Sequence, residues 1–219
     1  NRLAPLPFAF ATVWLANTAS LFLPVSNLTN LLAAHRLGDL DALGFLALLG
    51  PSAIIATLVT VAFLWVTHRR DPRGRFAPAR PPRLADTTLL RISAVVLVVM
   101  MPLLVIGTPP WMPALGAAVV LSIVFAWRSP RALRWALVPW QLVVFASGLF
   151  LAVGAAEALG SGALLAAATG TGDDLFSLWQ VAGVGLLGAN VVNNLPAYLA
   201  LESAAGSPVR LAALLIGVN

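Results

Sequence analysis

Residues 16–30, ANTASLFLPVSNLTN, interrupt an apolar sequence with a run of polar side chains and a proline. The polar members are Asn17, Thr18, Ser20, Ser26, Asn27, Thr29 and Asn30, and Pro24 lies among them. In such a hydrophobic chain, this pattern predicts a membrane helix that unwinds partway across the bilayer. Irregular backbone at that depth is tolerated only where it is buried in protein or lines a wet cavity. Broken helices near the midplane hold the substrate and ion sites of secondary transporters, so we expect a transport site here.

The composition indicates an all-α polytopic membrane protein. Hydrophobic residues make up 60% of the chain and charged residues 10%, whereas soluble domains average about 25% charged residues. The chain has no cysteine, which excludes disulfides, thiolate zinc sites and a cysteine nucleophile, and its two histidines argue against a histidine-built metal site. No nucleotide-binding loop or catalytic triad is present, so we expect neither an enzyme nor a bound cofactor or metal.

Apolar segments and basic loops give a membrane topology. We expect an unwound helix over 4–34, helices over 43–66, 92–107, 114–127 and 135–156, and the start of a further unwound helix at 209–219. The linker 67–91 carries seven arginines against Asp71 and Asp86, so the positive-inside rule places it in the cytoplasm. Its role is that of a solvated connection, or alternatively of a docking site for anionic lipid or a partner. A second basic loop, with Arg128, Arg131 and Arg134, follows two crossings later and is also expected inside, whereas 157–174 is expected outside.

Residues 175–203 are apolar but contain a second polar break. Asn190, Asn193, Asn194 and Pro196 predict a re-entrant hairpin that enters from outside and turns at 193–196. The alternative is a single kinked span, which would place 203–208 in the cytoplasm.

The two breaks supply the candidate substrate-binding residues. Amide side chains offer donors and acceptors without charge, so they can coordinate Na⁺ or bind a hydroxylated or anionic solute. Alternatively, the polar residues only hold helices together. The candidates are Asn17, Thr18, Ser20, Ser26, Asn27 and Asn30 in the first break, and Asn190, Asn193 and Asn194 in the second.

Glu202 is the candidate proton carrier, because ionisable residues are scarce in the apolar segments. It follows the predicted hairpin tip by about 9 Å of helix. The alternative interpretation is a carboxylate at the wet outer mouth. Glu157 is expected at the interface, and His35, Asp39 and Asp41 in an external loop.

Four blocks of sequence resemble the ArsB-type arsenite efflux permeases of the ion transporter superfamily. They are 16–21 (ANTASL), 25–30 (VSNLTN), 140–145 (WQLVVF) and 192–197 (VNNLPA). The resemblance implies an inverted-repeat ion transporter fold, with one broken helix and one re-entrant hairpin per repeat. On this template, 1–66 ends the first repeat, 92–219 belongs to the second, and the chain is a fragment of a longer permease that lacks both ends.

The resemblance also implies a function. A protein of this kind exports arsenite and antimonite across the bacterial cell membrane, by proton antiport with elevator-like alternating access. Implied partners are a second copy in a homodimer and a soluble arsenite-stimulated ATPase. Arsenous acid is mostly an uncharged trihydroxyl species at neutral pH, which suits a cavity of amides and hydroxyls. The alternatives are a Na⁺/H⁺ antiporter or an organic-anion carrier (dicarboxylate or citrate) of the same superfamily, and a membrane protein with no transport role.

Overall fold

The computed structural model describes residues 6–38, 40–69 and 86–219, and these residues form helices and connecting segments with no strand among them. Most of the predicted basic linker, 67–91, and Asp39 lie outside the described residues. The described residues form two compact units, one over 86–141 and one over 6–69 and 142–219. They are called here the α4–α5 unit and the main unit.

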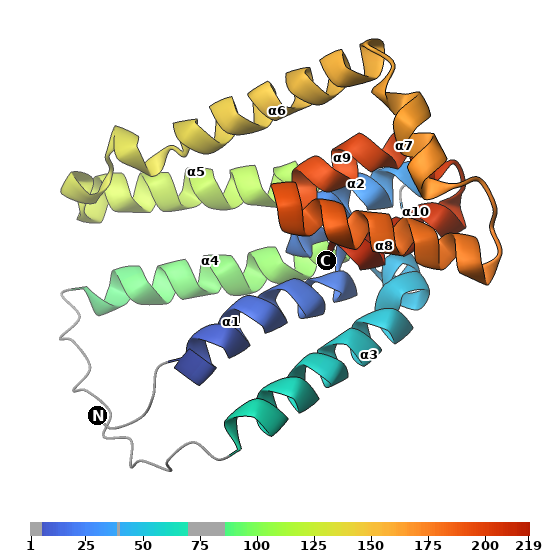
Figure 1. Ribbon diagram of the computed structural model, residues 1–219. Coiled ribbons are helices and arrows are strands. Elements are labelled where there is room, and N and C mark those ends of the chain that lie inside the picture. The colour runs from blue at the N-terminus through green and yellow to red at the C-terminus, as the bar shows by residue number, and fades with distance from the viewer. Residues whose placement is uncertain (1–5, 39, 70–85) are drawn as a thin grey trace. The chain divides into compact units, whose positions relative to one another are not determined.

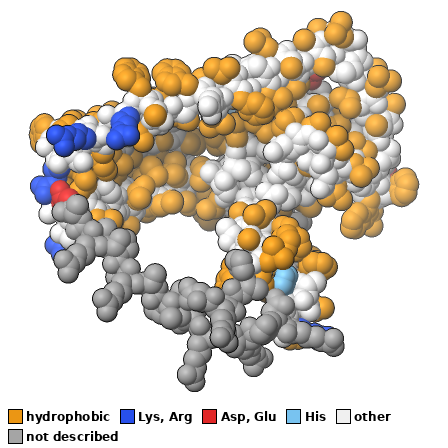
Figure 2. All heavy atoms as spheres, turned by 60° about the vertical axis from the view of Figure 1, so that its left-hand side comes forward, with side chains coloured by type: hydrophobic (Ala, Val, Ile, Leu, Met, Phe, Trp, Pro, Cys, Tyr) orange, Lys and Arg blue, Asp and Glu red, His pale blue; other side chains and the backbone are white. Residues whose placement is uncertain are grey.

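Five helices in the described part of the chain are long and apolar enough to cross a membrane. They are α3 (Ala42–His68), α4 (Thr87–Val105), α5 (Trp111–Arg128), α6 (Trp140–Ala158) and α8 (Leu175–Val192). A bilayer core of about 30 Å requires about 20 helical residues. Hydrophobic side chains cover much of the visible surface, which suits helices facing lipid (Figure 2). The prediction of an all-α polytopic membrane protein is confirmed.

In the α4–α5 unit, Asp86 joins the start of α4 to the end of α5. Its carboxylate accepts a hydrogen bond from the Leu89 backbone N–H at 2.9 Å and pairs with the Arg128 Nε at 2.7 Å. The two helices therefore run antiparallel, as Figure 1 shows. The hydrogen bonds from Arg128 and Leu89 hold the pKa of Asp86 below the ordinary aspartate value of 3.8.

We expect this cap to weaken in acid. Because the folded-state pKa of Asp86 is lowered, its charged form stabilises the cap at pH values above 3.8, and this contribution is lost as the pH falls through the lower folded-state pKa. Hydrogen-exchange protection of the first turn of α4 should then fall in the wild type. Asp86→Asn keeps a capping acceptor but carries no charge. In this variant the hydrogen-exchange protection, corrected for the pH dependence of intrinsic exchange, should not change between about pH 5 and pH 2. Equal pH dependence in both proteins would contradict the assignment.

Two 3₁₀ turns, η3 (Pro130–Ala132) and η4 (Trp135–Leu137), separate α5 from α6. The helix that the sequence predicts from residue 135 begins instead at Trp140. The reason is Pro139, because a residue before proline avoids the helical region, and Val138 is extended at φ −77°, ψ 118°.

The main unit begins with a helix that is interrupted at the polar stretch. α1 (Leu6–Thr18) passes into the short turns η1 (Ala19–Phe22) and η2 (Pro24–Ser26), and α2 (Leu28–Arg36) resumes. Leu23 and Asn27 are extended, with φ −136° and −151°. Asn27 caps α2, because its Oδ1 accepts the Asn30 backbone N–H at 2.7 Å. Proline and the capping amide thus end one helix and start the next.

The second polar break forms a helical hairpin. α8 and α9 (Asn194–Ala205) lie side by side in Figure 1, and a Cβ placed on Gly188 would be 3.2 Å from that of Ala197. The Arg36 Nη2 at the end of α2 lies 3.2 Å from Glu202 Oε1 near the end of α9. The pair brings the end of α2 close to the end of α9. The α8–α9 pair has the form of a helical hairpin, and its entry into the membrane from outside stays a prediction.

The hairpin base is closed by a buried arginine. α7 (Ser161–Thr169) lies within the segment expected outside the membrane, and α10 (Pro208–Val218) follows the hairpin. Arg210 on α10 is 2% exposed and donates to the carbonyls of Thr169, Gly170, Gly172 and Ala205. These carbonyls follow the ends of α7 and α9, where the helix dipole favours a cation. Arg210 therefore links α7, the hairpin and α10.

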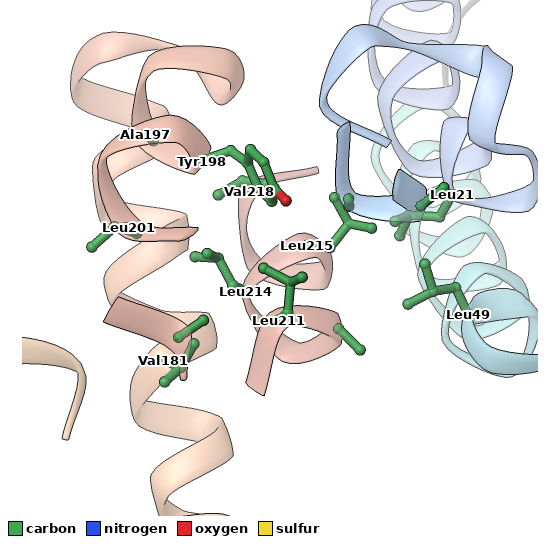
Figure 3. Close-up of a cluster of buried hydrophobic side chains, with 14 of the residues drawn as sticks. Leu21, Leu49, Val181, Ala197, Tyr198, Leu201, Leu211, Leu214, Leu215 and Val218 are labelled. Atoms are coloured by element: carbon green, nitrogen blue, oxygen red, sulfur yellow. The ribbon is translucent and has the colours of Figure 1, made fainter. Parts of the chain in front are cut away.

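The hydrophobic core lies between α10, the hairpin and the first broken helix. Leu214, Leu215 and Val218 of α10 are at most 2% exposed and cluster with Tyr198 of α9 and Leu21 of η1 (Figure 3). α10 thus contacts both predicted polar breaks.

Candidate functional site

A polar cavity of about 460 Å³ lies where the two breaks meet α10. Its polar lining consists of Asn17, Asn190, Asn193, Asn194 and Asn219, and we name it the amide pocket. Leu186, Ala189, Gly217 and Val218 also line it, so no charged side chain is among the described residues of the lining. The structure therefore brings together side chains from α1, the hairpin and the end of α10, which are far apart in the sequence.

The hairpin turn is set by Asn193. It adopts φ 88°, and in the described part of the chain it is the only residue other than glycine with positive φ. Asparagine tolerates this conformation better than most residues because its short amide can bond locally. Its Oδ1 accepts the Asn194 backbone N–H at 2.6 Å, which starts α9 beside the pocket. Asn190, one helical turn earlier on α8, donates to the Leu186 carbonyl at 2.8 Å.

A hydrogen-bond network adjoins the pocket and holds the unwound segment to α10. We name it the amide network, and its members are Ser20, Asn27, Asn30 and Asn219. The Asn27 Nδ2 donates to Asn219 Oδ1 at 2.8 Å and to Ser20 Oγ at 2.9 Å. The Asn219 Nδ2 donates to Asn30 Oδ1 at 3.2 Å. Asn30 is fully buried, and its Nδ2 donates to the Ser20 carbonyl at 2.7 Å.

The predicted site residues therefore divide into three groups. Asn17, Asn190, Asn193 and Asn194 line the pocket, whereas Ser20, Asn27 and Asn30 belong to the network. Thr18 and Ser26 do neither: the Thr18 hydroxyl donates to the Trp14 carbonyl in its own helix, and Ser26 is exposed.

Asn219 was not among the sequence candidates, although it belongs to both pocket and network. The only sequence signal was an amide directly after the apolar run 211–218. Because it forms no cluster with neighbouring polar residues, its role depends on what α10 packs against.

Glu202 lies outside the amide pocket. It lines a different cavity of about 680 Å³ with His35, Arg36 and Glu157. Its side chain is 15% exposed and forms the ion pair with Arg36. In the described ranges, no group of histidine and carboxylate side chains could hold a metal ion.

Comparisons with known proteins identify similar chains. The family model described as citrate transporter matches residues 1–217. The arsenical pump membrane protein of Escherichia coli is 30% identical over 210 residues, covering 89% of this chain and 48% of the relative. That of Yersinia enterocolitica is 31% identical over 216 residues, covering 91% and 49%. A 46 kDa membrane protein of Mycobacterium leprae is 30% identical over 211 residues, covering 87% and 47%.

The chain spans about half the length of the curated relatives it matches. No solved structure matches it significantly. The resemblance that the sequence blocks indicate is confirmed, and the comparisons point to a transporter rather than an enzyme. Together with the five apolar helices, the bacterial relatives indicate a multi-pass protein of a bacterial inner membrane.

Proposed function

The chain belongs to the citrate transporter family, and we propose that it is part of a secondary transporter that exports arsenite and antimonite by proton antiport. The substrate binds in the amide pocket, and the protein alternates access by an elevator-like movement. A homodimer and a soluble arsenite-stimulated ATPase are the partners that we propose with this function. The names of the arsenical pump relatives support the substrate class.

The observation that carries the proposal is the uncharged lining of the amide pocket. Five amides provide both donors and acceptors, which match the three hydroxyl groups of arsenous acid. The absence of cysteine from the chain means that arsenic is held here by hydrogen bonds and not by sulfur. A cavity of about 460 Å³ has room for this small solute with water around it.

A second candidate function is organic-anion transport, which the citrate transporter description of the matching family favours. Citrate carries up to three negative charges, and burying them requires compensating cations or helix ends. No arginine, lysine or histidine is among the described residues that line the pocket, so such a carrier would depend on bound Na⁺. A Na⁺/H⁺ antiporter would place Na⁺ itself on the amide oxygens.

Everted membrane vesicles from cells expressing the complete gene distinguish these functions. We expect arsenite uptake that follows an imposed proton gradient and does not require Na⁺. Citrate flux without arsenite flux would indicate that the protein is an organic-anion carrier. A Na⁺-dependent proton signal without arsenite flux would identify an antiporter.

The site is tested by Asn193→Ala and Asn194→Ala in the same vesicles. We expect each to abolish arsenite uptake while the protein accumulates in the membrane at near-normal levels, because these side chains face the pocket at the hairpin tip. Thr12→Ala is the control, since that exposed hydroxyl bonds only within its own helix. If the asparagine variants fail to accumulate, these residues serve packing and not binding.

A further inference from the structure

Glu202 separates two cavities at the end of the main unit away from the amide pocket. One is the cavity of about 680 Å³ and the other is about 290 Å³, and Arg36, Glu202 and Ser203 line both. The Glu202 side chain is 15% exposed and that of Arg36 is 64% exposed, with 3.2 Å between Nη2 and Oε1. A largely buried carboxylate is thus paired with a guanidinium whose side chain is free to rotate out into the solvent.

The hydroxyl of Tyr198 lies near the same carboxylate. Tyr198 is fully buried, and its hydroxyl has no hydrogen-bond partner among the described residues. Tyr198 and Glu202 are four residues apart on α9, so their side chains lie on one face of the helix. Glu202 and Arg36 are the charged groups that act on this hydroxyl. A buried hydroxyl without a partner is costly, and a protonated Glu202 on the same helix face would supply one.

The charged groups around Glu202 come from a few elements. α2 contributes His35 and Arg36, and α6 contributes Glu157. The parts of α10 that face Glu202 are the apolar Pro208 and Leu211, while Arg210 binds carbonyls elsewhere. The sequence of α7 has no titratable residue, and neither does that of α8. Arg36 is the cation whose guanidinium pairs with this carboxylate.

The pair is connected to the amide pocket by two helices. α2 extends from its capping residue Asn27 to Arg36, and α9 begins at Asn194 and contains Glu202. Each helix has an amide of the pocket or the network at its start and a member of the ion pair near its end, about 12 Å away. The ion pair therefore holds together the far ends of the two helices whose near ends form the substrate site.

We propose that Glu202 is the proton-exchange group of the transporter, with Arg36 and Tyr198 as its two alternating positioning residues. Deprotonated Glu202 binds Arg36 and holds α2 to α9. A proton from water adds to a carboxylate oxygen, Arg36 keeps its own protons and moves into water, and the protonated carboxyl donates a hydrogen bond to the Tyr198 hydroxyl oxygen. The released helices can then change their spacing at the pocket. This inference rests on the proposed proton-driven transport.

The pH profile of arsenite uptake in vesicles tests the exchange. Arg36→Gln should shift the midpoint to higher pH, because the carboxylate loses the cation paired with its charged form. Tyr198→Phe should shift it to lower pH, because the protonated carboxyl loses the phenol oxygen that accepts its hydrogen bond. Glu202→Gln should remove the stimulation by the gradient, and the exposed Arg134→Gln should change nothing. An unchanged midpoint in Arg36→Gln, or shifts of both variants in one direction, would overturn the proposal.

A second measurement does not depend on transport. The melting temperatures of the purified complete protein, Arg36→Gln, Glu202→Gln and the double variant form a double-mutant cycle. We expect coupling between the two residues at pH 7.5 and its loss in acid, where Glu202 is protonated. Coupling that does not depend on pH would show a purely structural pair. If the wild type transports no arsenite but the cycle behaves as expected, the proposed function fails and the proton-exchange pair stands.

Discussion

Gly217→Ala should abolish transport and lower the melting temperature of the protein, because α10 crosses α8 at this glycine with no room for a side chain. A Cβ on Gly217 would lie 2.1 Å from the carbonyl oxygen of Ala182, which is backbone and cannot rotate away. Overpacking costs about 1–3 kcal/mol, and more where backbone must move. The helices would have to separate directly beside Val218 and Asn219, which line the amide pocket.

The matched control is Gly183→Ala on α8. A Cβ there meets no atom within 4 Å, so the same methyl group enters open space. Uptake in vesicles and melting of the purified protein should both stay near wild type, since alanine also favours the helix. If Gly217→Ala transports as well as Gly183→Ala, the close packing of α10 on α8 does not position the site.

Asn219→Ala should reduce arsenite uptake at least tenfold. The amide of Asn219 contacts Ser20, Asn27 and Asn30, and its loss leaves the fully buried Asn30 without its side-chain donor. A buried polar group left unsatisfied costs about 1–3 kcal/mol, and a tenfold effect corresponds to about 1.4 kcal/mol. The unwound segment should therefore lose its attachment to α10, while the apolar core around Leu214 and Leu215 remains.

Ser26→Ala is the informative control for Asn219. Ser26 belongs to the same polar stretch as Asn27, yet it is exposed and takes no part in the amide network. Its replacement should leave uptake unchanged. The measurement is initial uptake rate in vesicles, normalised to the amount of each variant in the membrane. Equal loss in both variants would indicate that general disturbance of the stretch, and not the network, explains the effect of Asn219→Ala.

The polar breaks were predictable because each one disrupts a local pattern. Proline removes a backbone donor and asparagine caps a helix, so Pro24 and Asn27 end and restart the first helix wherever it packs. The hairpin turn at Asn193 follows from the same kind of local signal. The division of the chain into two symmetry-related repeats stays a prediction, because it concerns a relationship that extends beyond the described helices.

Other features could not be read from local patterns. α7 lies in a run of small residues that the sequence places outside the membrane, and Arg210, in the predicted helix start at 209–219, donates to four backbone carbonyls that no local pattern indicates. Thr18 and Ser26 have the residue types expected of the site. In the structure, however, Thr18 bonds within its own helix and Ser26 is exposed. Residue type and helical spacing select candidates, whereas direction depends on what each helix packs against.

The sequence by itself determined the membrane character of this protein, the two helix breaks and the resemblance to arsenical pumps, because hydropathy, proline and capping amides act through neighbouring residues. Only the tertiary structure decided that Asn219 lines the amide pocket and that Arg36 pairs with Glu202. The close crossing of α8 and α10 at Gly217 and the return of α9 to α2 bring these partners together. Such contacts join residues far apart in the chain, so they depend on how the helices pack.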